Sequence, residues 1–206
     1  MPTRDVIAFV RAALPTPPAR VLEVGAGSGD LAEALTTAGF RVVAIDPAAE
    51  LPLVRRVPLL ELDEPAAGFD AAVAVVSLHH VNPLAESCRR LAELLRPGAT
   101  LVVDEFDVER FDEQAATWWL GRREPDEGHA HGPAGAAELV AELRGHIHPL
   151  HELREALREW FALGEPVRGP YLYRWDLPPG LRDDEEELIA SGTLPATGAR
   201  LIGTRR

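Results

Sequence analysis

VLEVGAGSGDLAEAL, residues 21–35, runs from a short apolar segment through three glycines at alternate positions into a helical pattern. Glycines after a first strand let the backbone turn sharply into a helix and lie close to a ligand. The dinucleotide-binding fingerprint needs its third glycine where this chain has Asp30, and Glu23 stands two residues before Gly25. The stretch therefore predicts a strand, a ligand-approaching loop and a helix, and its spacing disfavours a nicotinamide dinucleotide.

Strand and helix patterns alternate from this stretch up to residue 104. Short apolar runs bounded by turn residues predict strands, and apolar residues at helical spacing predict helices. Such alternation with short connections is typical of right-handed crossovers in a doubly wound α/β sheet. We expect strands at 20–24, 41–45, 56–62, 71–77 and 99–104, and helices at 3–14, 29–38 and 82–96.

The composition excludes several classes of site and partner. The chain has 33 acidic and 21 basic residues and a net charge of -12, which argues against nucleic-acid and anionic-membrane surfaces. Every basic residue is arginine, so Schiff-base and phosphate-loop lysine chemistry is excluded. The single cysteine excludes a disulfide framework and a cysteine-cluster zinc site. Because the sequence shows neither a membrane-span run nor a signal-peptide pattern, we expect a cytoplasmic protein.

Asp46 stands at the tip of the second predicted strand, where a carboxylate can accept hydrogen bonds from both hydroxyls of a ribose. That arrangement serves any adenosine-containing cofactor. With these features in place, the chain resembles the class I S-adenosylmethionine-dependent methyltransferases of the small-molecule type. The resemblance covers residues 20–106 and rests on residues 21–35, VVAIDP (42–47), LDEPAAGFDAAVAVVSLHHV (62–81) and LAELLRPGATLVVDEF (91–106), where Ala99 replaces the family's usual second glycine.

The resemblance implies a Rossmann-like methyltransferase fold: a doubly wound, mostly parallel seven-stranded sheet with helices on both faces and an antiparallel last strand. It implies S-adenosylmethionine as cofactor and a small-molecule acceptor methylated at O, N or C. The length of 206 residues, against about 150 for an average domain, indicates a single domain, residues 1–206. We expect a cofactor-binding half at 15–106, a lid and substrate side at 107–162 with helices at 107–123, 134–145 and 149–162, and a C-terminal unit at 165–206 with strands at 167–175 and 199–204 around a helix at 180–191.

The family's cofactor-binding residues carry over to this chain by position. Glu23 matches the acidic residue that helps position the methionine moiety, and the glycines match the points where the backbone approaches the cofactor. Asp63 with Leu62 matches the adenine edge, although Glu61 or Glu64 is an alternative there. The implied cofactor-binding set is Glu23, Gly25, Ala26, Gly27, Gly29, Asp46, Pro47, Leu62, Asp63 and Ser77.

The catalytic candidates follow from the chemistry of methyl transfer. A sulfonium methyl is already an activated electrophile, so the protein must hold the acceptor in line with it and exclude water. A hydroxyl or ammonium acceptor also benefits from a general base, placed at the carboxyl ends of the strands. His80 after the fourth strand and Glu105 after the fifth are the candidates, with packing and helix-start roles as the competing interpretations.

Four further residues are candidates for contact with the acceptor. Trp118 and Trp119 fall on the helix predicted at 107–123. Because two adjacent indoles cannot both face inward, we expect one of them to close over an apolar or aromatic substrate. His79 and His148 are the other candidates, against packing or capping roles.

A metal site and two other functions are the competing hypotheses. Alternating histidines can chelate a transition metal, but no carboxylate at fixed spacing joins their two clusters, so we expect no metal. A non-catalytic cofactor-binding or regulatory protein remains an alternative, as does a nicotinamide-dependent oxidoreductase. The sequence assigns no acceptor, no oligomeric state and no role to the histidine tract, which is His129, His131, His146, His148 and His151.

Overall fold

A mixed β-sheet with helices on both faces forms the centre of the computed structural model, which describes residues 4–123 and 135–206. The strands are β1 (Arg20–Val24), β2 (Arg41–Ile45), β3 (Val54–Arg55), β4 (Phe69–Val75), β5 (Leu95–Phe106), β6 (Phe161–Leu163), β7 (Val167–Gly169) and β8 (Gly198–Arg205). The helices are α1 (Arg4–Ala13), α2 (Asp30–Thr37), α3 (Leu84–Leu94), α4 (Glu113–Leu120), α5 (Ala136–His146), α6 (Leu150–Arg158) and α7 (Arg182–Ala190). Three short 3₁₀ helices are η1 (Leu59–Glu61), η2 (Leu78–His80) and η3 (Leu172–Arg174).

The strand order confirms the predicted doubly wound sheet. It runs β3-β2-β1-β4-β5-β8-β6, and the first five of these strands are parallel to one another. The last strand, β8, is antiparallel to β5, as expected. The described residues form eight strands where seven were predicted, because β6 and β7 both pair with β8, at different points along it.

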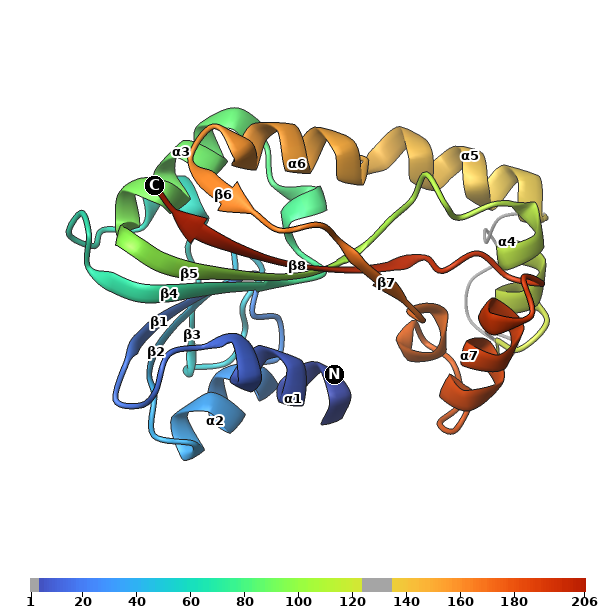
Figure 1. Ribbon diagram of the computed structural model, residues 1–206, viewed down its shortest axis with the longest axis horizontal. Coiled ribbons are helices and arrows are strands. Elements are labelled where there is room, and N and C mark those ends of the chain that lie inside the picture. The colour runs from blue at the N-terminus through green and yellow to red at the C-terminus, as the bar shows by residue number, and fades with distance from the viewer. Residues whose placement is uncertain (1–3, 124–134) are drawn as a thin grey trace.

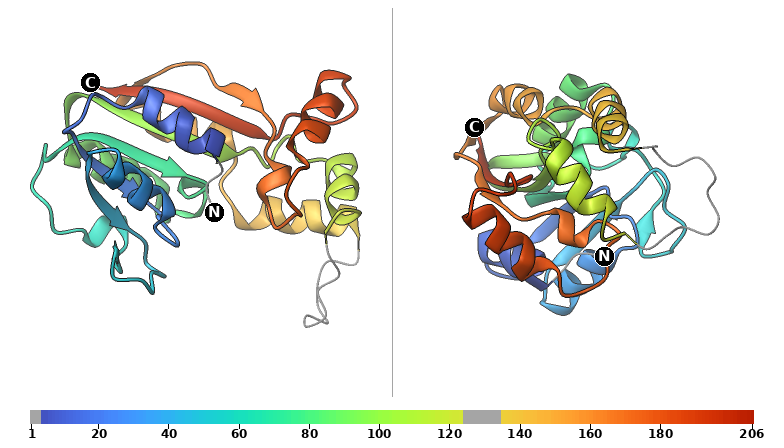
Figure 2. Two further views of the ribbon diagram at one scale, coloured as in Figure 1. Left: turned by 90° about the horizontal axis from the view of Figure 1, so that it is seen from below. Right: turned by 90° about the vertical axis from the view of Figure 1, so that its right-hand side faces the viewer.

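The helices form two layers and a separate group at one end of the sheet. Figure 1 shows α1 and α2 on one face and α3 and α6 on the other. Apolar side chains fill both interfaces, and the central strand β4 contributes alanines that are fully buried (Ala71, Ala72 and Ala74). A further apolar cluster lies between α4, α5, η3 and α7. These four elements pack together beyond one end of the sheet (Figure 2). No helix of the described part of the chain has the length and apolarity needed to cross a bilayer.

The register of the parallel strands brings their carboxyl ends to one edge. Glu23 of β1 lies beside Ala44 of β2 and Val73 of β4. The residues that follow β1, β2 and β4 therefore meet at the point where the chain reverses its winding direction, between β1 and β4. Ligands bind at such a switch point in open α/β sheets.

Four predicted elements need correction. The strand expected at 56–62 is instead the short β3 followed by η1, and the strand expected at 167–175 is β7 followed by η3. The helix expected at 149–162 ends at Arg158, and β6 follows. The helix expected at 107–123 begins only at Glu113, because the Asp112 side chain caps it by accepting a hydrogen bond from the Ala115 N–H at 2.8 Å.

Candidate functional site

Two cavities meet at the carboxyl edge of the sheet. The first, of about 390 Å³, extends from β1 and β2 to η1 and η2. The second, of about 270 Å³, lies between the glycine loop and the C-terminal residues around η3. Gly25 and Val76 line both, so the two cavities adjoin at the ends of β1 and β4. Val76 has a φ of 52°, a left-handed conformation that is strained for a β-branched residue.

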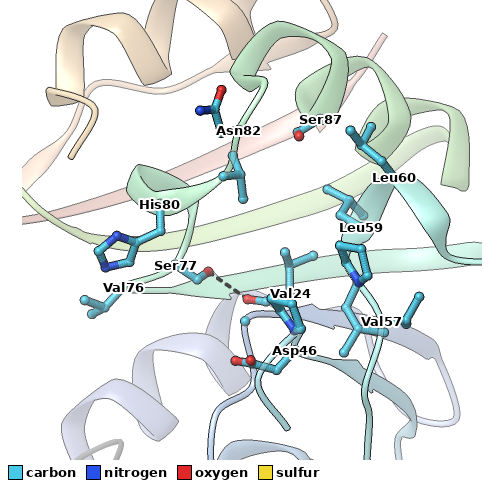
Figure 3. A pocket seen from close by; sticks show the side chains of 15 residues that line it. Val24, Asp46, Val57, Leu59, Leu60, Val76, Ser77, His80, Asn82 and Ser87 are labelled. Carbon is cyan, nitrogen blue, oxygen red and sulfur yellow. Dashed lines mark hydrogen bonds between the residues drawn. The ribbon is translucent and has the colours of Figure 1, made fainter. Parts of the chain in front are cut away.

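The glycine loop packs tightly against the end of β4. Gly25 has a φ of 71°, and a Cβ atom added to it would lie 2.2 Å from Cβ of Ser77. The Ser77 hydroxyl in turn donates a 2.7 Å hydrogen bond to the carbonyl of Val24 (Figure 3). Gly27 also has a positive φ, of 51°, but a Cβ there would meet nothing within 4 Å. The loop is thus fixed by contact at Gly25 and open at Gly27, where it faces the second cavity.

Asp46, the expected ribose ligand, lies at the edge of the first cavity. Its two carboxylate oxygens accept hydrogen bonds from the backbone N–H of Gly27 at 3.0 Å and of Ala48 at 2.8 Å. These contacts fix the side chain next to the glycine loop, and each carboxylate oxygen keeps a further lone pair for a ligand.

The apolar wall of the first cavity differs from the prediction. Leu59 and Leu60 of η1 line it together with Val57, whereas Leu62 is buried in the core and Asp63 is exposed. Figure 3 shows the three apolar side chains on the side of the cavity opposite His80. Leu62 and Asp63, which were expected at the adenine edge, therefore do not line this cavity, because a 3₁₀ helix replaces the end of the predicted strand.

Glu64, the alternative at this edge, is held elsewhere. Its carboxylate pairs with Arg20 at 2.7 Å and with Arg55 at 2.8 Å, and these contacts hold its pKa below the usual value. Glu61, the other alternative, is exposed and absent from the lining of the first cavity.

The two adjacent histidines of η2 have different surroundings. His79 is buried, with Nδ1 2.5 Å from Oε2 of Glu105. Oε1 of Glu105 accepts hydrogen bonds from the backbone N–H of Ser77 at 3.1 Å and of Leu78 at 2.7 Å. Glu105 is 0% exposed and lines neither cavity, so its contacts fix the turn after β4.

His80 lines the first cavity. Its pKa lies below the usual 6.5, mainly because it is partly desolvated and also because His79 is close, with ring centroids 4.1 Å apart. A neutral imidazole at neutral pH can accept a proton, so His80 has the placement and the charge state of a general base.

Glu23 faces the second cavity from β1. It is only 3% exposed, and its Oε2 has no hydrogen-bond partner among the described residues. Burial, with a smaller effect of nearby Asp30, raises the pKa of Glu23 to about 8. A buried carboxyl oxygen without a partner is costly, and a polar ligand group in the cavity would satisfy it.

The sequence and fold that form these cavities are similar to those of known proteins. A family model described as a methyltransferase domain matches residues 3–159. The chain belongs to this methyltransferase family. Membership confirms the predicted recognition of the class I S-adenosylmethionine-dependent methyltransferase family.

Individual relatives extend the comparison. The ubiquinone biosynthesis O-methyltransferase of Xanthomonas campestris pv. campestris (strain B100) is 40% identical over 115 residues, which are 48% of this chain and 48% of that protein. The chain thus spans about half the length of the curated relatives it matches. A solved S-adenosylmethionine-dependent methyltransferase from Mesorhizobium loti is 19% identical, with a TM-score of 0.61 and coverage of 99% of this chain and 98% of that one.

A further solved structure shares the fold. The Burkholderia thailandensis 1,6-didemethyltoxoflavin-N1-methyltransferase, solved with 1,6-didemethyltoxoflavin and S-adenosylhomocysteine, is 22% identical with a TM-score of 0.56, over 98% of this chain and 77% of that one. Together with the sheet order, these likenesses confirm the predicted Rossmann-like methyltransferase fold.

The structure places the two predicted lid tryptophans in the apolar cluster beyond the sheet. Trp118 is 8% exposed and Trp119 is 4% exposed, so the expectation that only one of them can pack inward is wrong. Both are accommodated because Trp119 stacks on Trp175, with centroids 4.3 Å apart, while Trp118 packs against Arg122. Neither indole lines the two cavities, although Trp175 does line the second.

Among the lining residues of the second cavity that the sequence did not indicate, three come from the C-terminal part of the chain. Tyr171, Arg174 and Trp175 lie on and around η3, far along the chain from the glycine loop that they face. No local sequence motif predicts that these residues line the cavity. The segment reaches the carboxyl edge of the sheet only through the pairing of β8 with β5 and of β7 with β8. A run of aromatic and basic residues, YLYRW, is their one sequence signal.

The remaining predicted residues either contact neighbouring elements or lie outside the described residues. His148 joins α6 to η2, since Nε2 lies 3.1 Å from the carbonyl oxygen of Val81 and the His148 N–H donates to the His79 carbonyl. Within residues 4–123 and 135–206, no three metal-ligating side chains come together. His129 and His131 lie outside the described residues.

Proposed function

We propose that this chain transfers a methyl group from S-adenosylmethionine to a small-molecule acceptor. The observation that carries the proposal is the Asp46 carboxylate, fixed by the Gly27 and Ala48 N–H groups at the edge of the first cavity. A carboxylate held there is suited to the two hydroxyls of a ribose. The bound cofactor supplies an electrophilic methyl group, so the residues of the chain need only bind, orient and deprotonate.

The cofactor-binding residues divide between the two cavities. In the first, Asp46 and Pro47 hold the nucleoside, and Leu59 and Leu60 take the place proposed earlier for Leu62 and Asp63 beside the adenine. In the second, Glu23, Ala26 and Gly27 face the methionine end. Gly25 and Ser77 fix the junction of the two cavities through their mutual contact. Gly29 supports the loop from behind, where an added Cβ would lie 2.9 Å from a methyl of Val54.

On the acceptor side, His80 is the proposed base. It lies beside Val81 and Asn82 in the lining of the first cavity, and its lowered pKa keeps it neutral and able to take a proton. Glu105 is a positioning residue, because its contacts to Ser77, Leu78 and His79 fix η2 without reaching the cavity. A base held in this way contributes about 100-fold or more to proton transfer from a hydroxyl or ammonium.

The acceptor is proposed to be small and largely apolar. Apolar side chains form most of the wall opposite His80, and the cavity of about 390 Å³ must also admit the nucleoside. The described residues of 107–162 and 165–206 complete the substrate side through the apolar cluster that supports Trp175. The net charge of -12 supports a partner other than nucleic acid.

The proposal is tested by methyl transfer. Purified protein is incubated with S-adenosylmethionine carrying a labelled methyl group and with a panel of small phenols, amines and enolisable compounds. We expect label in at least one product with the wild type, and a loss of about tenfold or more in kcat/KM with Asp46→Ala. Binding of the cofactor with no transfer to any acceptor would instead favour a non-catalytic binding protein.

A further inference from the structure

His148 binds the backbone on both sides of His80. It lies just before α6, and its N–H donates a 2.9 Å hydrogen bond to the carbonyl of His79. Nε2 of its ring lies 3.1 Å from the carbonyl oxygen of Val81. A carbonyl oxygen can only accept a hydrogen bond, so Nε2 of His148 carries the hydrogen in this contact. The residues before and after His80 are therefore both bound to His148.

A second support of the same turn comes from β5. Oε1 of Glu105 accepts hydrogen bonds from the N–H groups of Ser77 at 3.1 Å and of Leu78 at 2.7 Å. Its Oε2 lies 2.5 Å from Nδ1 of His79. The turn is thus held from β5 and from the start of α6, and His80, between the held residues, lines the first cavity.

The segment that carries His148 is itself anchored in two apolar clusters. Ile147 is 8% exposed and belongs to the cluster beyond the sheet, whereas Leu150 is 2% exposed and packs in the core on the α3 and α6 face. Arg144 of α5 also donates a 3.2 Å hydrogen bond to the carbonyl of Phe111, in the segment after β5. His148 therefore has a fixed position from which it can hold η2.

His148 is placed to act through η2 and not by contact with the acceptor. It lines neither of the two cavities, and its Nδ1 lies 3.4 Å from Oε2 of Glu152 on α6. The contact with Val81 needs only the hydrogen on Nε2, which the Nε2–H tautomer and the imidazolium both carry. The support of η2 therefore survives protonation of the His148 ring.

We propose that His148 is a positioning residue for methyl transfer, which holds η2 so that the His80 ring keeps its place beside the acceptor. The inference rests on the proposed function, in which His80 is the base, and adds to it a residue about 70 positions further along the chain. A base must lie within hydrogen-bond reach of the proton that it takes, and a displacement of about 1 Å can cost about 100-fold in rate. Support of the turn also limits the access of water to the His80 ring.

NMR titration of the His80 ring in the complex with S-adenosylhomocysteine tests the inference without an acceptor. The wild type is compared with His148→Ala, and the His80 signal is identified by its absence from His80→Ala. Burial lowers the pKa of His80 below 6.5, His79 lowers it further, and Glu105 raises it. Both neighbours are unchanged in His148→Ala, so admission of water to the ring is expected to move this pKa up toward 6.5.

Two further variants separate positioning from a general loss of structure. His148→Gln can present an N–H to the Val81 carbonyl, and it is expected to restore the pKa of His80 toward the wild-type value. His151→Ala is the matched control, because its ring lies on the same helix but pairs with Glu109 at 3.0 Å. This control is expected to leave the titration of His80 unchanged.

Turnover gives a second readout, measured with the phenol, amine or enolisable compound that accepts the labelled methyl group. His148→Ala is expected to lower kcat by about tenfold or more and to leave KM for S-adenosylmethionine within about threefold. His148→Gln should recover most of kcat, and His151→Ala should stay within about twofold of the wild type. If the alanine variant does not fold, His148→Leu takes its place, since it fills the volume of the ring without a donor.

The inference is overturned if His148→Ala and His151→Ala give the same His80 titration and the same kcat as the wild type. A lower melting temperature with both readouts unchanged makes His148 a structural residue only, and equal losses in His148→Ala and His148→Gln remove the role of the Val81 contact. The failure of the proposed function looks different. In that case the wild type labels no acceptor, or His80→Ala keeps the wild-type kcat, and the NMR titration still shows whether His148 holds the ring.

Discussion

Nδ1 of His79 lies 2.5 Å from Oε2 of Glu105, while the neighbouring His80 lines the first cavity. The 3₁₀ turn of η2 thereby divides two adjacent histidines between the core and the site. The first is paired with a buried carboxylate that also accepts hydrogen bonds from the backbone after β4.

Glu105→Ala is expected to destabilise the fold. The substitution leaves the N–H groups of Ser77 and Leu78 and one ring nitrogen of His79 without their acceptor in a buried site. Unsatisfied buried groups cost about 1–3 kcal/mol each, so the free energy of unfolding should fall by at least about 2 kcal/mol. Denaturant unfolding measures the change. A drop in turnover at unchanged stability would instead show that Glu105 acts in the chemistry.

His80→Ala is expected to lower kcat by about 100-fold while cofactor affinity stays within about threefold. The pH profile gives a second test. The imidazole must be neutral to accept a proton, and its pKa is lowered, so kcat/KM of the wild type should decline only below pH 6.5 as the pH falls. If the alanine variant keeps both the rate and this acidic limb, His80 is structural and catalysis is positioning alone.

Asp46→Ala is expected to weaken S-adenosylhomocysteine by at least about tenfold, since hydrogen bonds from two ribose hydroxyls to a charged group are lost. Asp63→Ala is the matched control. That residue is exposed and outside the cavity lining, so its removal should leave the affinity within about twofold. The reverse order of the two effects would restore the adenine edge to the position that the sequence indicates.

Glu23→Gln is expected to stabilise the free protein at neutral pH. The folded-state pKa is raised from 4.5 to about 8, so the stability associated with the protonated carboxyl is complete below pH 4.5 and is lost as the pH rises toward 8. Across that window each pH unit removes about 1.4 kcal/mol, which the glutamine variant does not lose. Melting temperatures of both proteins between pH 4.5 and 8 test this. Parallel curves would mean that Glu23 is ionised in the folded state at no cost.

Much of the site could be predicted from the sequence because its parts are local. The glycines and Asp46 each follow a strand directly, and the parallel register alone brings them together at one edge. Leu62 and Asp63, which the resemblance places at the adenine edge, line neither cavity. The boundary between β3 and η1 depends on packing of Leu59 into the core, which the apolar pattern of residues 56–62 does not distinguish from a strand.

The residues on the C-terminal side of the site could not be predicted from local sequence patterns. Arg174 and Trp175 reach the glycine loop only through antiparallel pairing of β8 and a carboxylate of α7, contacts between residues far apart in the chain. The two tryptophans of α4 were both buried because Trp175 supplies a stacking partner that no pattern on α4 itself reveals. Long-range contacts of this kind determine which polar atoms remain without partners, and so where a ligand binds.

Calorimetric titration of the wild type with S-adenosylhomocysteine, run beside a titration with NAD, tests the central claim most directly. The account predicts binding of S-adenosylhomocysteine in the micromolar range, about 8 kcal/mol, and no heat from NAD. The same titration with Asp46→Ala should show the affinity reduced. Binding of NAD with no response to S-adenosylhomocysteine would contradict the assignment of the two cavities to S-adenosylmethionine.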